Sequence, residues 1–283
     1  MSQAVVERRS VLVDGVPVSY LSAGEGPTVL MLHGTYWSRV WLPVLADTAA
    51  AGLRPVAVDL PGCGRSGGEL TLETAAVPNL AEWVTRFLTA LGVDGHVNVA
   101  GHDIGGAIAQ HLLVARPGGI EVRALALVNS VTYDSWPVPT VARYRDPAVV
   151  AATSAQDLVT ARRQSITTGL ARPATDEELA DYLSPWADPR VARSWMALAG
   201  AAHGDYTQKL IPALRESAVP KLLVWGEDDP FQRIAYAERF TAEIPQSRLV
   251  RVPKAGHIPM ENDPATVAQA LAGFFRDQTP AAV

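Results

Sequence analysis

The chain has 283 residues, of which 48% are hydrophobic and 19% are charged, and its formal net charge is −5. This composition is typical of a folded globular protein and argues against an intrinsically disordered one. The charge gives no electrostatic reason to expect nucleic acid or an anionic membrane as a partner, so we expect a small-molecule substrate.

The sequence also predicts a soluble, cytoplasmic protein without a metal or a cofactor. The N-terminal residues lack the apolar region of a secretory signal, and no apolar stretch approaches the about 20 residues that span a bilayer. The single cysteine, Cys63, excludes an internal disulfide and a cysteine-rich metal site, and we interpret it as a small hydrophobic residue near the rim of the site. The basic pairs Arg8-Arg9 and Arg162-Arg163 are interpreted as solvated surface.

Short β-rich runs alternate along the chain with longer helical patterns, which predicts an α/β fold. We expect a mostly parallel eight-stranded sheet with helices on both faces. The expected strands are 11–13, 16–21, 28–32, 54–58, 96–100, 123–128, 221–225 and 248–252. The expected helices are 40–51, 80–91, 104–115, 233–244 and 264–275. The first two strands flank Asp14-Gly15, a hairpin signal, so they are expected to be antiparallel.

Residues 133–214 interrupt this alternation, because they are rich in proline and contain no convincing strand. They separate residues 1–132 from residues 215–283, which together form the predicted core. A helical insert between parallel strands lies above their carboxyl ends, where ligands bind in this kind of sheet. We therefore expect 133–214 to be a helical cap, or lid, over the site.

Residues 101–106, with the sequence GHDIGG, directly follow an expected strand and precede an expected helix. Small residues on both sides of a central residue are typical of the nucleophile elbow, whose strained backbone makes the central side chain project from the sheet edge. The central residue here is Asp103 rather than serine. Because aspartate also caps helices, capping is the alternative interpretation.

A second motif closes the expected strand 28–32, where His33-Gly34 is followed by Thr35. In an elbow of this kind, one oxyanion-hole amide comes from this loop and the other from the residue after the nucleophile. The predicted donors are therefore the amides of Thr35 and Ile104. His33 itself is interpreted as a packed structural histidine.

Two later loops carry a carboxylate and a histidine in the order that the elbow fold uses. Asp229 follows the strand 221–225 and is our choice for the group that orients the base, with Asp228 as the alternative and Glu227 facing solvent. His257 follows the next strand, between small residues, and is the predicted base.

These residues resemble the α/β-hydrolase superfamily over essentially the whole chain, including the loop DLPGCGRS at 59–66. The elbow is similar to the branch that contains epoxide hydrolases, haloalkane dehalogenases and fluoroacetate dehalogenases. In that branch an aspartate forms an alkyl-enzyme ester, which a histidine-activated water hydrolyses. The resemblance implies that Asp103 is the nucleophile, His257 the base and Asp229 its partner. Asn129 stands where some members carry the acid, and an amide cannot supply that charge.

A carboxylate nucleophile selects the reaction. It is already anionic at neutral pH, whereas a serine hydroxyl must first lose a proton. It suits displacement at a saturated carbon, because attack on an ester carbonyl would give an anhydride. The sequence therefore argues against an ordinary esterase, lipase or peptidase.

The leaving group depends on the residues around the site. In the branch that the chain resembles, cap tyrosines protonate an epoxide oxygen, and haloalkane dehalogenases typically place tryptophan where this chain has Ile104. Fluoroacetate dehalogenases carry arginines just after the nucleophile; Ile104 and Ala107 offer none, so a small anionic haloacid is disfavoured. Tyr36 also replaces the proline of the usual H-G-x-P pattern. The aromatic candidates for lining the pocket or donating a proton are Tyr36, Trp37, Tyr133, Trp136, Tyr182, Trp186 and Tyr206.

Three hypotheses follow. The first is an epoxide hydrolase that converts an apolar or aromatic epoxide to a diol. The second is a haloalkane dehalogenase with the same first step. The third belongs to another class, a non-hydrolytic ligand-binding or cyclase-like protein on this fold, and it is motivated by the unusual loop HGTYW at 33–37.

Overall fold

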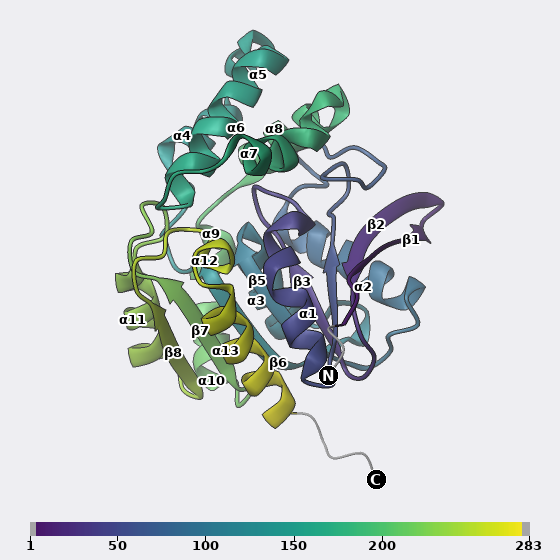
Figure 1. Ribbon diagram of the computed structural model, residues 1–283, viewed down its shortest axis with the longest axis vertical. Helices are drawn as coiled ribbons and strands as arrows, with labels where there is room; N and C mark the ends of the chain where they lie inside the picture. The colour runs from purple at the N-terminus through teal and green to yellow at the C-terminus, as the bar shows by residue number, and fades with distance from the viewer. Residues whose placement is uncertain (1–3, 279–283) are drawn as a thin grey trace.

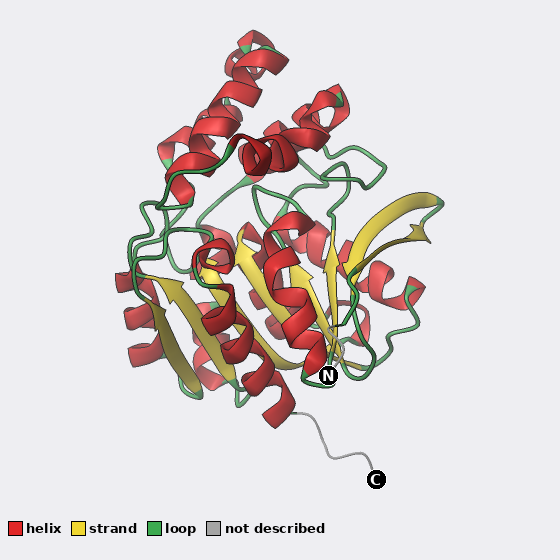
Figure 2. Ribbon diagram, viewed as in Figure 1, coloured by secondary structure: helices red, strands yellow, loops and turns green. Residues whose placement is uncertain are grey.

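One eight-stranded sheet organises the protein in the computed structural model, which describes residues 4–278 (Figure 2). The strand order is β1-β2-β4-β3-β5-β6-β7-β8. β2 pairs antiparallel with β1 and β4, and the other neighbours are parallel. The predicted α/β-hydrolase fold is confirmed. The bounds are β1 Glu7–Val13, β2 Val16–Ser22, β3 Thr28–Leu32, β4 Arg54–Val58, β5 His96–Asp103, β6 Glu121–Ser130, β7 Lys221–Gly226 and β8 Ser247–Val252.

Helices cover both faces of this sheet (Figure 1). α1 and α13 pack together on one face, while α2, α3 and α11 cover the other. Within residues 4–278, no helix is both long enough and apolar enough to cross a membrane. The bounds are α1 Leu42–Ala50, α2 Val77–Ala90, α3 Ile104–Ala115, α11 Ile234–Glu243, α12 Pro259–Asn262 and α13 Pro264–Asp277.

The continuous apolar run of β3 follows from this sandwich. Leu30 and Leu32 lie in the core on the side of α2 and α3, whereas Val29 and Met31 lie in the core on the side of α1 and α13. All four side chains are completely buried. Burying one such side chain contributes about 1.5–3 kcal/mol, so both faces of the strand favour apolar residues.

Two central strands run past their predicted carboxyl ends. β5 includes His102 and Asp103, and β6 includes Asn129. The apolar pattern ends before these polar residues, but His102 and Asp103 still pair with β6, while Asn129 lies at an irregularity of β6. The pairing of β5 with β6 shifts register between His102 and Asp103. Irregularities of this kind re-aim side chains beside active sites.

Between β6 and β7, the described chain forms helices and turns but no strand. α4 to α8 stand above the carboxyl ends of the strands (Figure 1). α9 and α10 instead pack against α3, beside the sheet, so only the first five helices of the predicted cap range stand above the site. The bounds are α4 Pro139–Ala142, α5 Pro147–Ala152, α6 Ala155–Gly169, α7 Asp176–Leu183, α8 Pro189–Ala201, α9 Asp205–Gln208 and α10 Ile211–Glu216.

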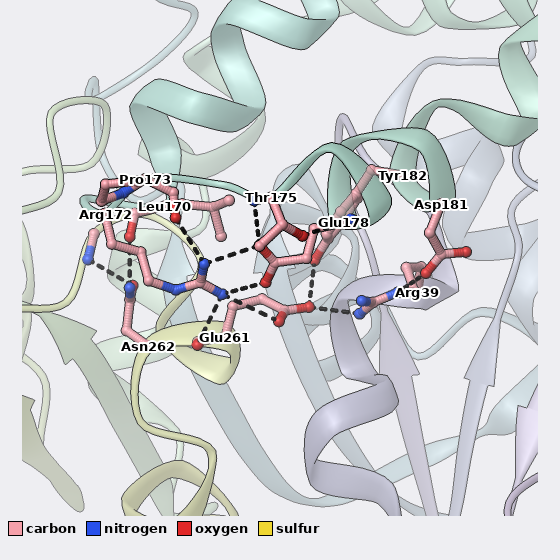
Figure 3. Close-up of polar contacts among 11 residues, drawn as sticks. Arg39, Leu170, Arg172, Pro173, Thr175, Glu178, Asp181, Tyr182, Glu261 and Asn262 are labelled. Carbon is pink, nitrogen blue, oxygen red and sulfur yellow. Dashed lines mark hydrogen bonds and ion pairs between the residues drawn. The ribbon is translucent and has the colours of Figure 1, made fainter.

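Glu261, in α12, ties α7 to the core (Figure 3). Its carboxylate accepts hydrogen bonds from Tyr182 Oη at 2.8 Å and from Arg39 Nη1, and it lies 3.9 Å from Arg172 Nη2. Arg39 also pairs with Asp181. The Glu261 side chain is only 8% exposed, so water screens these charges less than it screens surface ion pairs. The network fixes one end of the helical layer over the sheet.

Candidate active site

Asp103 lies in a sharp turn between β5 and α3. Its φ is 53° and its ψ is −127°, a conformation that costs a residue with a side chain about 1–3 kcal/mol. From the end of β6, Val131 N–H and Ser130 Oγ donate to the Asp103 carbonyl at 3.2 and 3.3 Å. These bonds support the strained residue. Its side chain is buried beneath the cap, with 6% of the residue exposed.

Gly101 and Gly34 allow neighbouring backbone to approach this turn. A Cβ atom on Gly101 would lie 2.5 Å from Gly106 Cα. A Cβ atom on Gly34 would lie 2.5 Å from Ile104 N and 2.6 Å from Asp103 Oδ2. Real Cβ atoms do not come so close, so Gly101 is needed for the turn to close on α3 and Gly34 for the two loops to pack together.

One carboxylate oxygen of Asp103 is bound by Thr35. Asp103 Oδ2 accepts hydrogen bonds from the Thr35 backbone N–H at 2.9 Å and from Thr35 Oγ1 at 2.7 Å. The carboxylate caps none of the described amides of α3, so the helix-capping alternative is wrong. The other predicted donor, Ile104, is the first residue of α3, and within residues 4–278 its amide forms no hydrogen bond to the Asp103 carboxylate.

His257 and Asp229 form a buried pair at the same sheet edge. His257 Nδ1 lies 2.9 Å from Asp229 Oδ2, and its Nε2 lies 4.0 Å from Asp103 Oδ2. Burial by itself lowers the pKa of His257, but the charge and hydrogen bond of Asp229 outweigh it and raise the pKa above 6.5. Asp228 and Glu227 are exposed, which leaves Asp229 as the carboxylate that reaches the imidazole.

Asp229 is oriented by Asn129 and by two backbone amides. Asn129 Nδ2 donates to Asp229 Oδ2 at 2.7 Å, while the N–H groups of Phe231 and Gln232 donate to Oδ1 at 2.7 and 3.0 Å. Burial alone would raise the pKa of Asp229, but the charge of His257 and these hydrogen bonds lower it. The carboxylate is therefore kept ionised beside the imidazole.

Two further histidines, His33 and His102, hydrogen-bond to backbone groups around the site. His33 Nε2 accepts a hydrogen bond from Leu60 N–H at 3.0 Å, and its Nδ1 lies 2.9 Å from the Gly34 carbonyl, so it has the packed role that we predicted. His102 Nε2 lies 2.8 Å from the His257 carbonyl. Burial lowers the pKa of His102 to about 4, so it remains neutral while it holds the backbone of His257.

A cavity of about 300 Å³ separates Asp103 from the cap. Thr35, Ile104 and His257 line it from the core side together with Asp103. A concave, largely apolar space with a few convergent polar groups is typical of a small-molecule site. The cap contributes most of the remaining lining, including Trp136, Val138, Val141, Tyr144, Arg162 and Trp195.

Among the aromatic candidates, Tyr36 and Trp136 line this cavity. The Tyr36 ring centroid lies 6.0 Å from that of His257, and burial raises the pKa of Tyr36 to about 12. Trp136 Nε1 donates to Thr207 Oγ1 at 2.7 Å, so its N–H group is already used. Trp136 therefore offers the cavity an apolar ring.

Three of the tyrosine candidates, Tyr133, Tyr182 and Tyr206, do not line the cavity. The Tyr133 hydroxyl donates to Glu243 at 3.3 Å, and the Tyr182 hydroxyl donates to Glu261 at 2.8 Å (Figure 3). Tyr206 packs at the edge of the core among neighbouring rings. Two of these hydroxyls are therefore hydrogen-bonded to carboxylates outside the cavity. No sequence pattern indicated these hydrogen bonds.

Trp37 and Trp186 also lie outside the cavity lining. Trp37 Nε1 donates to the Tyr182 carbonyl at 3.1 Å, so it anchors its loop to α7. Trp186 packs behind the wall, with its ring centroid 5.9 Å from that of Trp195 and 5.5 Å from Arg162 Cζ. Both side chains therefore support lining residues or loops without lining the cavity.

Three lining residues, Tyr144, Trp195 and Arg162, were absent from the predicted site. The interpretation of Arg162 as solvated surface is wrong, because the residue is 4% exposed and lines the cavity. It lies on the buried face of α6 between Leu158 and Ile166. Leu158, Arg162 and Ile166 are four residues apart and so share one face of the helix. This spacing is the sequence signal that identifies Arg162 as buried.

Cys63 packs within the core and is not among the residues that line the cavity. Burial raises the pKa of its thiol to about 12. It is a small buried hydrophobic residue, as predicted, but not at the rim of the site.

Comparison with known proteins places the chain in a family. Residues 29–270 match the model of the alpha/beta hydrolase family, so the chain belongs to that family. It is 28% identical to the haloalkane dehalogenase of Bradyrhizobium diazoefficiens, over 95% of this chain and 94% of that protein. It is 25% identical to the AB hydrolase superfamily protein YfhM of Bacillus subtilis, over 96% and 99% of the two chains.

Solved structures share the fold. The haloalkane dehalogenase DbeA from Bradyrhizobium elkani superposes with a TM-score of 0.81, at 24% identity over 99% of this chain and 100% of that one. The haloalkane dehalogenase DatA from Agrobacterium tumefaciens gives 0.80, at 21% identity over 97% of each chain. The protein is therefore a hydrolase of the α/β fold whose relatives include haloalkane dehalogenases.

Proposed function

We propose that the protein hydrolyses a bond at a saturated carbon through a covalent alkyl ester on Asp103. The observation that carries this proposal is the position of its carboxylate. One oxygen is bound by Thr35, and His257 Nε2 lies 4.0 Å from that oxygen. A nucleophile, a donor pair and an oriented base thus meet at the wall of one cavity.

In the first step, Asp103 Oδ1 attacks the substrate carbon. The new C–O bond forms as the bond to the leaving group breaks, and the leaving group takes the electron pair. The hydrogen bonds from Thr35 to Oδ2 keep the carboxylate in a fixed orientation, which lowers the entropic cost of reaching the in-line geometry.

In the second step, water attacks Cγ of the Asp103 ester. His257 Nε2 accepts the water proton, and Asp229 stabilises the resulting imidazolium. Negative charge develops on Oδ2, which already accepts two hydrogen bonds from Thr35. A donor at this position is worth about 3–4 kcal/mol in related chemistry. The tetrahedral intermediate then breaks the bond between Cγ and Oδ1, and the departing alcohol takes the proton from His257.

An epoxide is the substrate class that we favour. Ring opening leaves an alkoxide that needs a proton, and Tyr144 and Tyr36 are the tyrosines that line the cavity. Burial raises the pKa of Tyr36 to about 12, so its hydroxyl stays protonated at neutral pH. We assign the donor role to Tyr144, because it lies in the cap wall against Trp195. The helices α4 to α8 act as the lid.

Haloalkane hydrolysis is the second candidate, and the 28% identical haloalkane dehalogenase favours it. A halide leaving group needs N–H donors. The two cavity tryptophans use theirs elsewhere, since Trp195 Nε1 donates to the Thr35 carbonyl at 3.0 Å and Trp136 Nε1 to Thr207. Because these N–H groups are not free to bind a halide, we place haloalkane hydrolysis second.

One panel separates the candidates. Wild type and Asp103→Asn are supplied with styrene-type epoxides and with short bromoalkanes, and diol and halide are measured. We expect diol formation that Asp103→Asn abolishes. Halide release without diol would favour the dehalogenase. Activity that Asp103→Asn leaves unchanged would overturn the ester mechanism and favour a non-hydrolytic or cyclase-like protein.

A further inference from the structure

Arg162 is a buried cation with incomplete partners. The residue is 4% exposed and forms no ion pair with a carboxylate among residues 4–278. Its Nη2 donates to the Thr35 carbonyl at 2.9 Å and its Nη1 to Ser165 Oγ at 3.5 Å, but its Nε has no hydrogen-bond partner. Burying an unsatisfied donor on a charged group costs free energy, and such groups are normally paired.

Aromatic rings fix the position of this guanidinium. Its Cζ lies 5.0 Å from the ring centroid of Tyr36, 4.8 Å from that of Trp195 and 5.5 Å from that of Trp186. Stacked rings attract the charge and exclude water, but they do not satisfy an N–H group lying in the guanidinium plane. The side chain is therefore preorganised while part of its donor capacity stays unused.

The residues that line the cavity include one acidic and two basic side chains. The acidic side chain in the lining is Asp103, whereas Arg162 and the exposed Arg143 are both basic. Asp103 lies on the core side, and both arginines belong to the cap segment. A ligand in the cavity therefore meets the Asp103 carboxylate on the core side and the Arg162 cation on the cap side.

We propose that Arg162 recognises a carboxylate group carried by the substrate. A guanidinium presents N–H groups in a planar fork that matches a carboxylate, and a buried pair of this kind is strong when fully hydrogen-bonded. The acid end of the substrate binds at the cap wall, and its reacting carbon points to Asp103. This assignment rests on the proposed function for the reacting end. Ile104 and Ala107 supply no arginine, and for that reason an anionic substrate was not expected. In this proposal the arginine comes from the cap instead.

A purely structural role for Arg162 explains fewer of these observations than carboxylate recognition does. The Thr35 carbonyl already accepts a hydrogen bond from Trp195 Nε1 at 3.0 Å, so the loop has a second anchor. The hydrogen bonds within the protein use Nη2 and Nη1 and leave Nε without a partner.

Binding to the unmodified protein is the first arm of the test. Hexanoate and hexanamide have nearly the same shape and differ in charge, and their affinities are measured by titration calorimetry on wild type and on Asp103→Asn. We expect hexanoate to bind at least about tenfold more tightly than hexanamide to both proteins, as for other buried carboxylate–arginine pairs. Equal affinities would overturn the proposal without any change to Arg162.

Turnover by variants is the second arm. An ω-epoxy fatty acid is compared with its methyl ester in wild type, Arg162→Met, Arg162→Lys and the control Arg163→Met, whose parent side chain is exposed on the same helix. We expect Arg162→Met to lower the acid-to-ester ratio of kcat/KM at least about tenfold, Arg162→Lys to restore part of it and Arg163→Met to leave it unchanged. An equal loss for acid and ester would identify Arg162 as structural and contradict the proposal.

The two arms separate this inference from the reaction. Hexanoate binding that depends on Arg162, without turnover of any epoxide or haloalkane, supports the carboxylate site and contradicts the proposed function. Turnover of neutral substrates together with equal hexanoate and hexanamide affinities supports the function and overturns the carboxylate site. If Arg162→Met does not fold, the ligand comparison on wild type decides.

Discussion

Thr35 donates two hydrogen bonds to the same oxygen of Asp103, from its backbone N–H at 2.9 Å and from its hydroxyl at 2.7 Å. The same residue accepts from the cap at its carbonyl, through Trp195 and Arg162. The loop after β3 therefore connects Asp103 to the cap. In our mechanism this oxygen becomes the oxyanion of the second step.

Replacing Thr35 by valine should slow hydrolysis of the ester more than its formation. Valine keeps the shape and the backbone donor but removes the hydroxyl from Asp103 Oδ2, and loss of one such donor costs about 100-fold or more in related enzymes. Rapid-quench kinetics with intact-protein mass measurement should detect accumulated ester. Thr35→Ser keeps the hydroxyl and should behave like wild type. Equal rates for the valine and serine variants would exclude the hydroxyl from the mechanism.

The turnover rate should rise with pH through a midpoint above 6.5. His257 must be neutral to accept a proton from water, and Asp229 raises its pKa above that value, so the protonated, inactive form persists to higher pH. A pH profile of kcat checks this sign. Asp229→Asn should lower the midpoint and reduce the rate by up to about 10⁴-fold, as loss of the orienting carboxylate does in serine proteases. A wild-type midpoint below 6.5 would contradict the assignment.

Much of the fold was predictable, because most strands carry an apolar run that ends in a turn signal; β1 was predicted only over 11–13, since residues 7–10 are polar and exposed. The ends of β5 and β6 were not, since His102, Asp103 and Asn129 continue the sheet without the apolar signal. The order of Asp103, Asp229 and His257 placed them after β5, β7 and β8, at the carboxyl edge of one sheet, where ligands bind in such folds.

The cap was harder to predict. Short helices separated by prolines show weak periodicity, and which tyrosine faces the cavity depends on distant carboxylates such as Glu243 and Glu261. The burial of Arg162 was not predicted, because a charged residue is assumed to face water. Its spacing from Leu158 and Ile166 nevertheless placed it on an apolar helix face.

Two tyrosine-to-phenylalanine changes should have opposite effects. Tyr144→Phe removes the hydroxyl that we assign as proton donor and should slow epoxide opening by about 100-fold or more. Tyr182→Phe should leave kcat within about threefold, because its hydroxyl bonds Glu261 outside the cavity, and should lower the free energy of unfolding by about 1 kcal/mol. Single-turnover rates and urea unfolding provide the measurements. A slow Tyr182→Phe with a normal Tyr144→Phe would reverse the assignment.

The backbone strain at Asp103 should be measurable. Asp103→Gly and Asp103→Ala both remove the carboxylate, but only glycine adopts φ 53° and ψ −127° without strain. The glycine variant should therefore be about 1 kcal/mol more stable than the alanine variant, whereas glycine is usually the less stable of the two. Denaturant unfolding of both variants provides the comparison. An alanine variant as stable as the glycine variant would mean that the turn stores no strain.

The ester on Asp103 is tested most directly by one turnover in water enriched in heavy oxygen, followed by mass analysis of the peptide that contains Asp103. Water attacks Cγ in our mechanism, so the label should enter the Asp103 carboxylate while the first product carries an unlabelled oxygen from Oδ1. His257→Gln should trap the ester as a mass adduct on the same peptide. Label found only in the product, with an unlabelled Asp103 peptide after complete turnover, would contradict the mechanism.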